Sequence, residues 1–463
     1  MSDNPKPEVM IVGAGLGGMM LAILLERMNV PYHVYERATV MKPLGAAMAM
    51  SVNIIPVFEQ LGLLEKLMAI SVDYVSSTVY DHKLNVVGVS SMRNQKEICG
   101  YDKILFPRPE LQQMMLEMIP PEKITYGKRV LRTEEKEDRI LIHCSDNTSY
   151  VGDILIGADG AHSSVRQSIY KQLESKGLLP QPDTENLAMG YNCMVGVTNP
   201  LDPAKYPKLL DDNAHFNVVL GKERRSWGTN KLTNNRICWI LLIQFVDAEE
   251  AAEQRFRNSE WGPESNDMMA QEFRDFPHPF GGTIGELIDA TPKQSQSKVF
   301  LEEKMFETWH YGRAALLGDA CHKMIPAGGQ GAINAMQDAV ILSNVFYDMP
   351  DASSKSIDAA FRSYRAQRYD HAKMELEFSS VLGKLFAGQG FFDRLIRKVL
   401  FNYVPYAIHG RQFMKASSYR PQLNWMPQVP NHGTGYVLPQ QPSWRYQKEL
   451  ERLKQEGYGV SAV

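Results

Sequence analysis

The residues best suited to do chemistry near the start of this 463-residue chain are three glycines and one acid. Gly13, Gly15 and Gly18 follow a short apolar run, and Glu36 ends the next one, 18 residues later. In a strand–turn–helix unit, glycines at this spacing allow a tight turn, a close approach of a pyrophosphate to the backbone, and tight packing of helix on strand. An acid at the end of the second strand can accept both hydroxyls of an adenosine ribose, and it disfavours a 2′-phosphate. The spacing therefore predicts a dinucleotide site that favours FAD or NAD over NADP.

Two more pairs of glycine and acid stand where an apolar run gives way to a predicted helix. Asp159 and Gly160 follow one such run, and Gly318 and Asp319 follow another. Backbone amides at a helix N-terminus can hold an anionic or electron-rich group. Asp319 is placed to bind a ribityl hydroxyl, although an ordinary turn aspartate would occupy the same position.

Arg108 and Ala49 are further candidates with two interpretations each. Arg108 stands just ahead of a helix predicted from Pro109, where it can hold a ligand or pair with a surface acid. Ala49 lies in the segment 44–51, which consists almost wholly of small or flexible residues. Such a segment can pass beside a flat cofactor ring, or it can be a flexible connection.

Several elements must position these residues. An apolar helical period predicts one helix over 53–67, and alternation within 74–89 predicts strands of a different sheet. Segments 140–144 and 150–156 are predicted to be a strand pair of the nucleotide-binding part. Four further strands are predicted within 187–299, namely 189–197, 216–220, 226–228 and 237–245.

The region 351–404 is predicted to be mostly helical. Within it, 391–403 is amphipathic. Packing onto the body of the protein is favoured there over contact with a membrane or a second subunit.

Composition argues against several classes of protein. A formal net charge of −3, with 44% hydrophobic and 22% charged residues, indicates a globular protein that binds neither nucleic acid nor an anionic membrane. Five scattered cysteines without CxxC spacing predict reduced thiols, with no disulfide framework and no metal site. The polar start of the chain predicts neither a signal peptide nor a membrane span, so we expect a cytoplasmic protein.

The three motifs, in this order and spacing, resemble those of the FAD-dependent monooxygenases of the aromatic hydroxylase type, the single-component flavoprotein monooxygenases. The match covers about the first 345 residues. The resemblance implies that Gly13, Gly15 and Gly18 hold the pyrophosphate of FAD and that Glu36 binds its adenosine ribose. The other roles that it implies are these: Asp159 and Gly160 serve FAD and NAD(P)H together, Gly318 and Asp319 bind the ribityl chain, Arg108 contacts FAD, and the backbone of Gly331 and Ala332 approaches the isoalloxazine.

The same resemblance implies a mixed α/β (α+β) fold. A Rossmann-like FAD-binding domain is interrupted by an antiparallel β-sheet substrate domain and followed by C-terminal helices. The expected boundaries are 6–75, 100–175 and 300–345 for the FAD-binding domain, 76–99 and 176–299 for the substrate domain, and 346–463 for the C-terminal helical region and tail.

The tail narrows the resemblance. The segment from Arg420 to Pro427, followed by Gly433 and by 439–442, resembles the C-terminal signature of fungal members that tailor indole alkaloids, terpenoids and polyketides. This implies an enzyme that uses NAD(P)H and O₂ to hydroxylate or epoxidise a bulky apolar intermediate through a C4a-hydroperoxyflavin. An electron-rich indole or alkene is favoured over a phenol, since the substrate span offers only His215 and Tyr191 as bases for deprotonation.

The predicted substrate span departs from its relatives at one place. Several fungal members have an arginine directly after the tyrosine of one strand, whereas Tyr191 is followed here by Asn192. Asn192 can hydrogen-bond a substrate carbonyl but cannot act as a cation. We take Tyr191 and Asn192 as candidate catalytic residues. A flavin oxidase or dehydrogenase, which would need no external reductant, is the alternative function, and the oligomeric state is left open.

Overall fold

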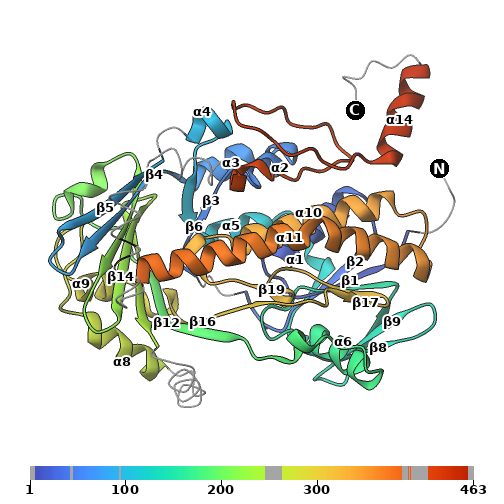
Figure 1. The fold of residues 1–463 in the computed structure, drawn as a ribbon, viewed down its shortest axis with the longest axis horizontal. Helices are drawn as coiled ribbons and strands as arrows, with labels where there is room; N and C mark the ends of the chain where they lie inside the picture. Colours follow the sequence, from blue (N-terminus) through green and yellow to red (C-terminus); the bar gives the residue numbers. More distant parts are fainter. Residues whose placement is uncertain are drawn as a thin grey trace.

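The computed structural model describes residues 6–41, 45–92, 95–245, 263–387, 395, 397 and 415–456. Its two large sheets lie at opposite ends of the view in Figure 1, one mainly parallel and one mainly antiparallel. The long helix α11 (Ser354–Ala387) runs along the molecule from the parallel sheet to the antiparallel sheet and contacts both. This architecture confirms the expected mixed α/β fold.

The parallel sheet has six strands and is assembled from separated stretches of the chain. Its strands are, in spatial order, β17 (His310–Tyr311), β18 (Ala314–Leu316), β11 (Ile154–Gly157), β1 (Val9–Val12), β2 (Tyr32–Tyr35) and β7 (Ile124–Thr125). Neighbours run parallel except β17 and β18. Every residue of β1, β11 and β18 is buried, as expected for parallel strands covered on both faces.

The second sheet has ten strands. In spatial order they are β19 (His322–Lys323), β16 (Gln296–Met305), β12 (Ala188–Val197), β15 (Arg236–Gln244), β14 (Arg225–Leu232), β13 (Ala214–Leu220), β4 (Val72–Asp81), β6 (Ile104–Pro107) and β3 (Ala47–Met50), with β5 (Val86–Ser91) beside β4. The four strands predicted within 187–299 are present. Strands β3 and β6, and most of β16, come from outside the ranges assigned to the substrate domain, so the domain boundaries stay a proposal.

The described helices cover the faces and ends of these sheets. They are α1 (Leu16–Arg27), α2 (Ile55–Gln60), α3 (Leu64–Ala69), α4 (Gln95–Cys99), α5 (Arg108–Leu116), α6 (Ser164–Ser175), α8 (Pro263–Phe273), α9 (Ile284–Asp289), α10 (Gly331–Asp348), α11 and α14 (Trp444–Gln455). Helices α1 and α10 pack together on the parallel sheet. Helices α8 and α9 share an apolar cluster with Trp227 and Trp239 of the antiparallel sheet.

The helix predicted over 53–67 is wrong as a single element, because the chain forms α2 and α3 instead. Gly62 lies between them with a φ of +71°, in the left-handed region that favours glycine. Its N–H donates to the carbonyl of Glu59, and the N–H of Leu63 donates to that of Phe58. This is the Schellman arrangement that ends many helices.

Two other predicted elements also differ. The segment 44–51, expected to be a connection or a loop beside the cofactor, contains β3, which pairs with β6 and buries Met48 and Met50. The strand predicted over 150–156 divides between β11 and β10 (Ser149–Gly152), which pairs with β9 (Ile140–Cys144). β9 in turn pairs with β8 (Val130–Glu135) in a separate three-stranded sheet. The amphipathic segment 391–403 lies outside the described residues, apart from Leu395 and Arg397.

Residues 415–443, which we call the C-terminal strap, return over α2 near the start of the chain (Figure 1). The side chain of Asn53 donates to the carbonyl of Ala416 at 2.8 Å, and the side chain of Gln60 accepts from the N–H of Leu423 at 2.8 Å. A cavity of about 610 Å³ lies along the strap.

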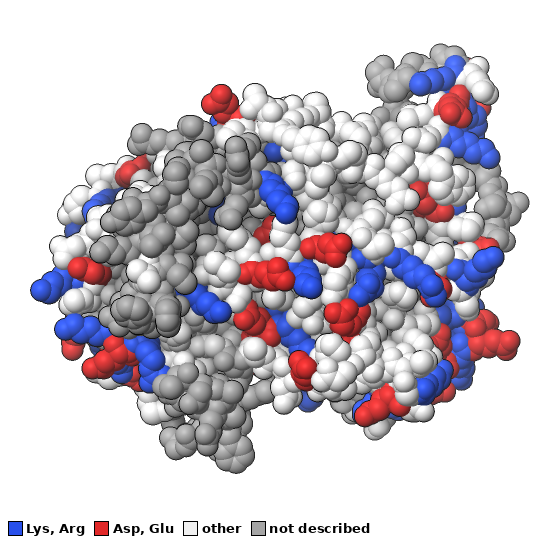
Figure 2. Space-filling model, in the orientation of Figure 1, with Lys and Arg blue, Asp and Glu red and all other residues white. Residues whose placement is uncertain are grey.

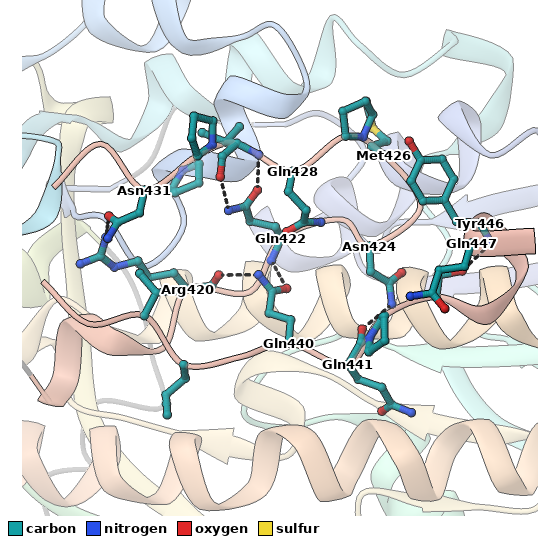
Figure 3. A pocket seen from close by; sticks show the side chains of 18 of the residues that line it. Arg420, Gln422, Asn424, Met426, Gln428, Asn431, Gln440, Gln441, Tyr446 and Gln447 are labelled. Carbon is teal, nitrogen blue, oxygen red and sulfur yellow. Dashed lines mark hydrogen bonds between the residues drawn. The ribbon is translucent and has the colours of Figure 1, made fainter. Parts of the chain in front are cut away.

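Figure 3 shows the side-chain amides that join the strap residues along this cavity. The side chain of Gln422 accepts from the N–H of Val429 at 2.8 Å and donates to its carbonyl at 3.1 Å. The side chain of Gln440 accepts from the N–H of Gln422 at 2.7 Å and donates to the carbonyl of Arg420 at 3.2 Å. These amides hold the two runs of the strap together.

The surface carries no dominant charge on the face shown in Figure 2, where acidic and basic side chains alternate. All five cysteines are free and buried. In the described part of the chain, no helix has the length and apolarity needed to cross a membrane.

Candidate cofactor and substrate site

The three glycine and acid motifs meet at one edge of the parallel sheet. Strands β1, β2, β11 and β18 end in register at Val12, Tyr35, Gly157 and Leu316. The residues that follow them therefore lie along a single carboxyl edge. In open α/β sheets this edge is where ligands bind.

The first motif has the shape that a pyrophosphate needs. Gly13 has a φ of +107°, and a Cβ there would overlap the carbonyl of Ala158. A Cβ at Gly18 would overlap the carbonyl of Gly13, so helix and turn pack closely. A Cβ at Gly15, in contrast, would meet no atom within 4 Å. The turn thus has one open side at the N-terminus of α1, and this fits a phosphate group bound by backbone amides.

Glu36 closes the same turn from β2. Its carboxylate accepts hydrogen bonds from the N–H groups of Ala14 and Ala38, each at 2.8 Å. The acid is therefore fixed beside the glycine turn, at the position from which a ribose hydroxyl is bound in such folds.

The second motif is organised by Asp159. Its Oδ2 accepts from the N–H of Ser164 at 2.7 Å at the start of α6, whereas its Oδ1 is buried without a partner among the described residues. Burial raises the pKa of Asp159, and hydrogen bonds from Ser163 and Ser164 oppose that rise. Gly160 has a φ of +80°, and a Cβ there would meet nothing within 4 Å.

Arg166 connects the second motif with the third. Its guanidinium donates to the carbonyl of Ala161 at 2.6 Å and to that of Ala320 at 2.9 Å. The same group stacks over Phe306, with its centre 4.1 Å from the ring. Sequence reasoning did not assign a role to this arginine.

The third motif rests on a buried ionic network. The N–H of Gly318 donates to Oδ2 of Asp338 at 2.8 Å, and His322 lies 2.6 Å from the same oxygen. The other oxygen of Asp338 accepts from Arg368 at 2.8 Å, and all three side chains are fully buried. Burial raises the pKa of Asp338, but His322 and Arg368 outweigh it and hold that pKa below its ordinary value.

This network was missed from the sequence. Asp338 and Arg368 are 30 residues apart on two different helices. The signal available in the sequence was Asp338, a charged residue inside an otherwise apolar helical stretch.

Asp319 lies on the exposed side of the same turn. Its carboxylate forms an ion pair with Lys323 at 2.6 Å. Arg108, the first residue of α5, lies within electrostatic reach: burial by surrounding protein lowers its pKa, and Asp319 opposes that shift. The Arg108 side chain nevertheless keeps a solvent-exposed surface. The structure thus brings the predicted FAD-contacting arginine and the predicted ribityl-binding acid together.

Ala49 lies near the segment expected to approach the flavin ring. A Cβ at Gly329 would lie 3.9 Å from that of Ala49, and one at Gly331 would lie 4.0 Å from Oδ1 of Asp319. Gly331 and Ala332 begin α10, two residues after the end of the turn η6 (Pro326–Gly328). The backbone at Gly331 is therefore open toward the predicted ribityl-binding acid.

Tyr191 and Asn192 occupy opposite faces of β12. Tyr191 belongs to an apolar cluster with Ile325, and Ala327 of η6 packs against that cluster. Alternation along the strand places Asn192 on the other face with Met194, which packs in the cluster covered by α8 and α9. Asn192 is 6% exposed, and its Oδ1 has no partner in the described residues. The structure therefore brings Tyr191 close to the cofactor motifs and separates Asn192 from them.

Comparison with known proteins agrees with this geometry. A family model described as "FAD binding domain" matches residues 6–379. FAD-dependent monooxygenase paxM of Penicillium paxilli is 28% identical, with 97% of this chain and 93% of that protein aligned. FAD-dependent monooxygenase ptmM of Penicillium ochrochloron is also 28% identical, over 88% of this chain and 94% of its own.

Solved structures share the fold. HpxO of Klebsiella pneumoniae, in complex with FAD and uric acid, superposes with a TM-score of 0.69 at 24% identity, covering 89% of this chain and 97% of its own. The 2,6-dihydroxypyridine-3-hydroxylase of Arthrobacter nicotinovorans gives a TM-score of 0.61 at 18% identity, covering 84% and 95%. With the family match covering most of the sequence and the motifs meeting at one sheet edge, the chain belongs to the FAD-binding monooxygenases and is an FAD-dependent oxidoreductase.

Proposed function

We propose that the enzyme uses NAD(P)H and O₂ to hydroxylate or epoxidise a bulky, largely apolar natural-product intermediate of the indole alkaloid, terpenoid or polyketide type. The observation that carries this proposal is the apolar cluster around Tyr191. It lies on the face of the antiparallel sheet that packs against η6, just ahead of Gly331. An indole or alkene suits such a surface because it is apolar. It is also electron-rich, so it needs no deprotonation before it is oxidised.

Bound FAD supplies the oxygen transfer in this proposal. The chain's own residues bind and orient the reactants. The turn from Gly13 to Gly18 and Glu36 hold the nucleotide end, while Asp319 and Arg108 hold the middle of the cofactor. Tyr191 and its apolar neighbours keep water away from the reacting groups and position the substrate.

The likeness to paxM and ptmM supports a fungal natural product as the substrate class. His215 does not point to a phenol, because its ring nitrogens are engaged with Ser76 at 2.6 Å and Asp211 at 3.0 Å. Both ring nitrogens therefore already have partners within the chain, and neither is left to bind a phenol.

The test is consumption of NAD(P)H under air by the FAD-loaded enzyme, with a panel of prenylated indoles, polyprenyl alkenes and phenols. We expect an apolar indole or alkene to stimulate consumption and to gain one oxygen atom from O₂, which mass spectrometry of reactions under ¹⁸O₂ would show. Substrate oxidation that proceeds without NAD(P)H would instead establish the alternative, a flavin oxidase or dehydrogenase.

A further inference from the structure

Helix α11 carries buried charged atoms that the cofactor motifs do not use. Arg368 is fully buried, and Glu375, about two turns further along, is 7% exposed. Nη1 of Arg368 and Oε2 of Glu375 are each buried without a hydrogen-bond partner in the described part of the chain. Arg368 still interacts with Tyr419, whereas no partner is found among the described residues for this oxygen of Glu375. Buried charged atoms nearly always have partners, so the unpartnered carboxylate oxygen points to a polar ligand group.

Lys103 approaches Glu375 from the residues just ahead of β6. Its Nζ lies 4.8 Å from the centre of the Tyr74 ring. Lys103 and Glu375 attract each other electrostatically, but the described side chains form no direct ion pair. Burial lowers the pKa of Lys103 to about 8 against the influence of Glu375. Burial likewise raises the pKa of Glu375 to about 7 against Arg368 and Lys103.

The other titratable groups around the pair keep one protonation state near neutral pH. Asp338 is bound to Arg368 and stays ionised. Burial lowers the pKa of His371, whose ring stacks on Tyr419 at 3.7 Å, to about 4. Burial also raises the pKa of Tyr74 and of Tyr419, so both phenols stay neutral. Among these described groups, only Lys103 and Glu375 change charge between about pH 6 and pH 9.

The pair flanks the segment that precedes Gly331. On one side, Tyr74 belongs to a cluster against which Ala49 and Phe216 pack, and Ala49 faces Gly329. On the other side, Ser379 lies one turn beyond Glu375, and a Cβ at Gly328 would be 2.5 Å from its Oγ. Lys103 and Glu375 therefore approach the contact between β3 and η6 from two directions.

We infer that Lys103 and Glu375 form a polar subsite that binds a hydroxyl group at one end of the substrate. The ammonium donates a hydrogen bond to the hydroxyl oxygen, and the carboxylate accepts the hydroxyl hydrogen. This inference rests on the proposed function and refines its substrate class to an apolar molecule with one alcohol group. Since both charged forms are required, binding is strongest between about pH 7 and pH 8.

The experiment uses the FAD-loaded enzyme and two probes, farnesol and farnesyl methyl ether. Binding is followed by the change in flavin absorbance from pH 6 to pH 9. We expect farnesol to bind about tenfold more tightly than the ether at pH 7.5, the effect of one good hydrogen-bonding site. Farnesol affinity should fall on both sides of this pH, and affinity for the ether should stay flat.

Two variants and two matched controls separate this role from a structural one. Glu375→Gln should remove the acidic limb of the farnesol profile, and Lys103→Met should remove the alkaline limb. Glu377→Gln, an exposed position on the same helix, and Lys96→Met, an exposed lysine on α4, should keep both limbs.

Equal binding of farnesol and its ether, or unchanged limbs in both subsite variants, would overturn the inference and leave the proposed function intact. If neither probe perturbs the flavin while a phenol from the panel is turned over, the proposed substrate class fails together with the inference.

Discussion

Glu36 illustrates how one side chain combines folding with binding. Its two oxygens already accept backbone N–H groups, one from Ala14 in the first motif and one from Ala38 in the loop after β2. Each carboxylate oxygen has more than one lone pair, so hydroxyl groups can be bound without breaking these bonds. The acid therefore orders the turn before the cofactor arrives.

We expect Glu36→Ala to weaken FAD binding by about 1–3 kcal/mol, because the ribose hydroxyls and two backbone amides lose their acceptor. Glu36→Gln keeps one acceptor oxygen and should lose less. FAD affinity measured by flavin fluorescence checks this, with the exposed Glu65→Ala on α3 as the control. Asp319→Ala should weaken FAD binding from the ribityl side, and unchanged affinity in both alanine variants would exclude this placement of the cofactor.

The buried pair of Asp338 and Arg368 is expected to matter for folding more than for binding. Arg368→Met leaves a buried carboxylate partly unpaired and should lower the free energy of unfolding by about 3–5 kcal/mol. The double variant Asp338→Asn with Arg368→Met should cost less than the sum of the two single changes, since neither charge is then left alone. Chemical denaturation of the four proteins measures this coupling, and simple additivity would contradict it.

We predict that the buried side chain of His278 makes the folded protein less stable in acid. His278 is 1% exposed, and neither ring nitrogen has a partner in the described residues. Burial lowers its pKa from 6.5 to about 4, so the folded state favours the neutral ring. Only the unfolded chain takes up this proton between pH 6.5 and 4, so the contribution is complete above pH 6.5 and is lost as the pH falls toward 4.

His278→Phe keeps a ring beside Tyr206 and should make the stability less dependent on pH over this window. Thermal unfolding midpoints of both proteins at pH 7 and pH 5 test this. An identical loss of stability in the variant would assign the acid sensitivity to other groups.

At the scale of elements, strand β12 separates two neighbouring residues that the sequence could not distinguish. Period-two alternation gives Tyr191 and Asn192 different faces, but which face meets the cofactor depends on the packing of η6 and α8 from distant parts of the chain. The glycine turns were predictable because each one is encoded locally.

Tyr191→Ala should raise hydrogen peroxide release relative to product formation, because a poorly held substrate leaves the oxidising equivalent to decay unused. Asn192→Ala, on the opposite face, should keep product formation coupled to NAD(P)H consumption. Product and peroxide measured in the same reactions decide between them. Uncoupling in the Asn192 variant alone would return the catalytic role to that residue.

At the scale of the whole molecule, the sequence predicted the units and their motifs better than their boundaries. The two sheets and the carboxyl edge could be predicted from local apolar runs and glycines. The places of β3 and β6 in the antiparallel sheet could not be predicted, because their partner strands come from elsewhere in the sequence. The ionic network around Asp338 depends in the same way on helices brought together only by the fold.

At this scale we also predict that the C-terminal strap stabilises the folded protein. Gln60 on α2 makes three hydrogen bonds to strap residues, at 2.8, 3.0 and 3.1 Å. Gln60→Ala should therefore lower the free energy of unfolding by about 1–3 kcal/mol. Gln113→Ala on α5, which removes an exposed bond to Glu117, should change it by less than about 0.5 kcal/mol. Equal effects of the two substitutions in denaturation experiments would show that the strap adds little.

The strap also determines when the N-terminal region can finish folding during synthesis. Asn53 and Gln60 bind residues that follow them by more than 360 positions. At about 5–20 residues per second, a ribosome needs on the order of 20–70 s to deliver those partners. Throughout that interval the nascent N-terminal region carries a surface whose final cover has not yet been made. A premature stop codon just before residue 415 would therefore produce a chain that has every cofactor motif but never covers this surface.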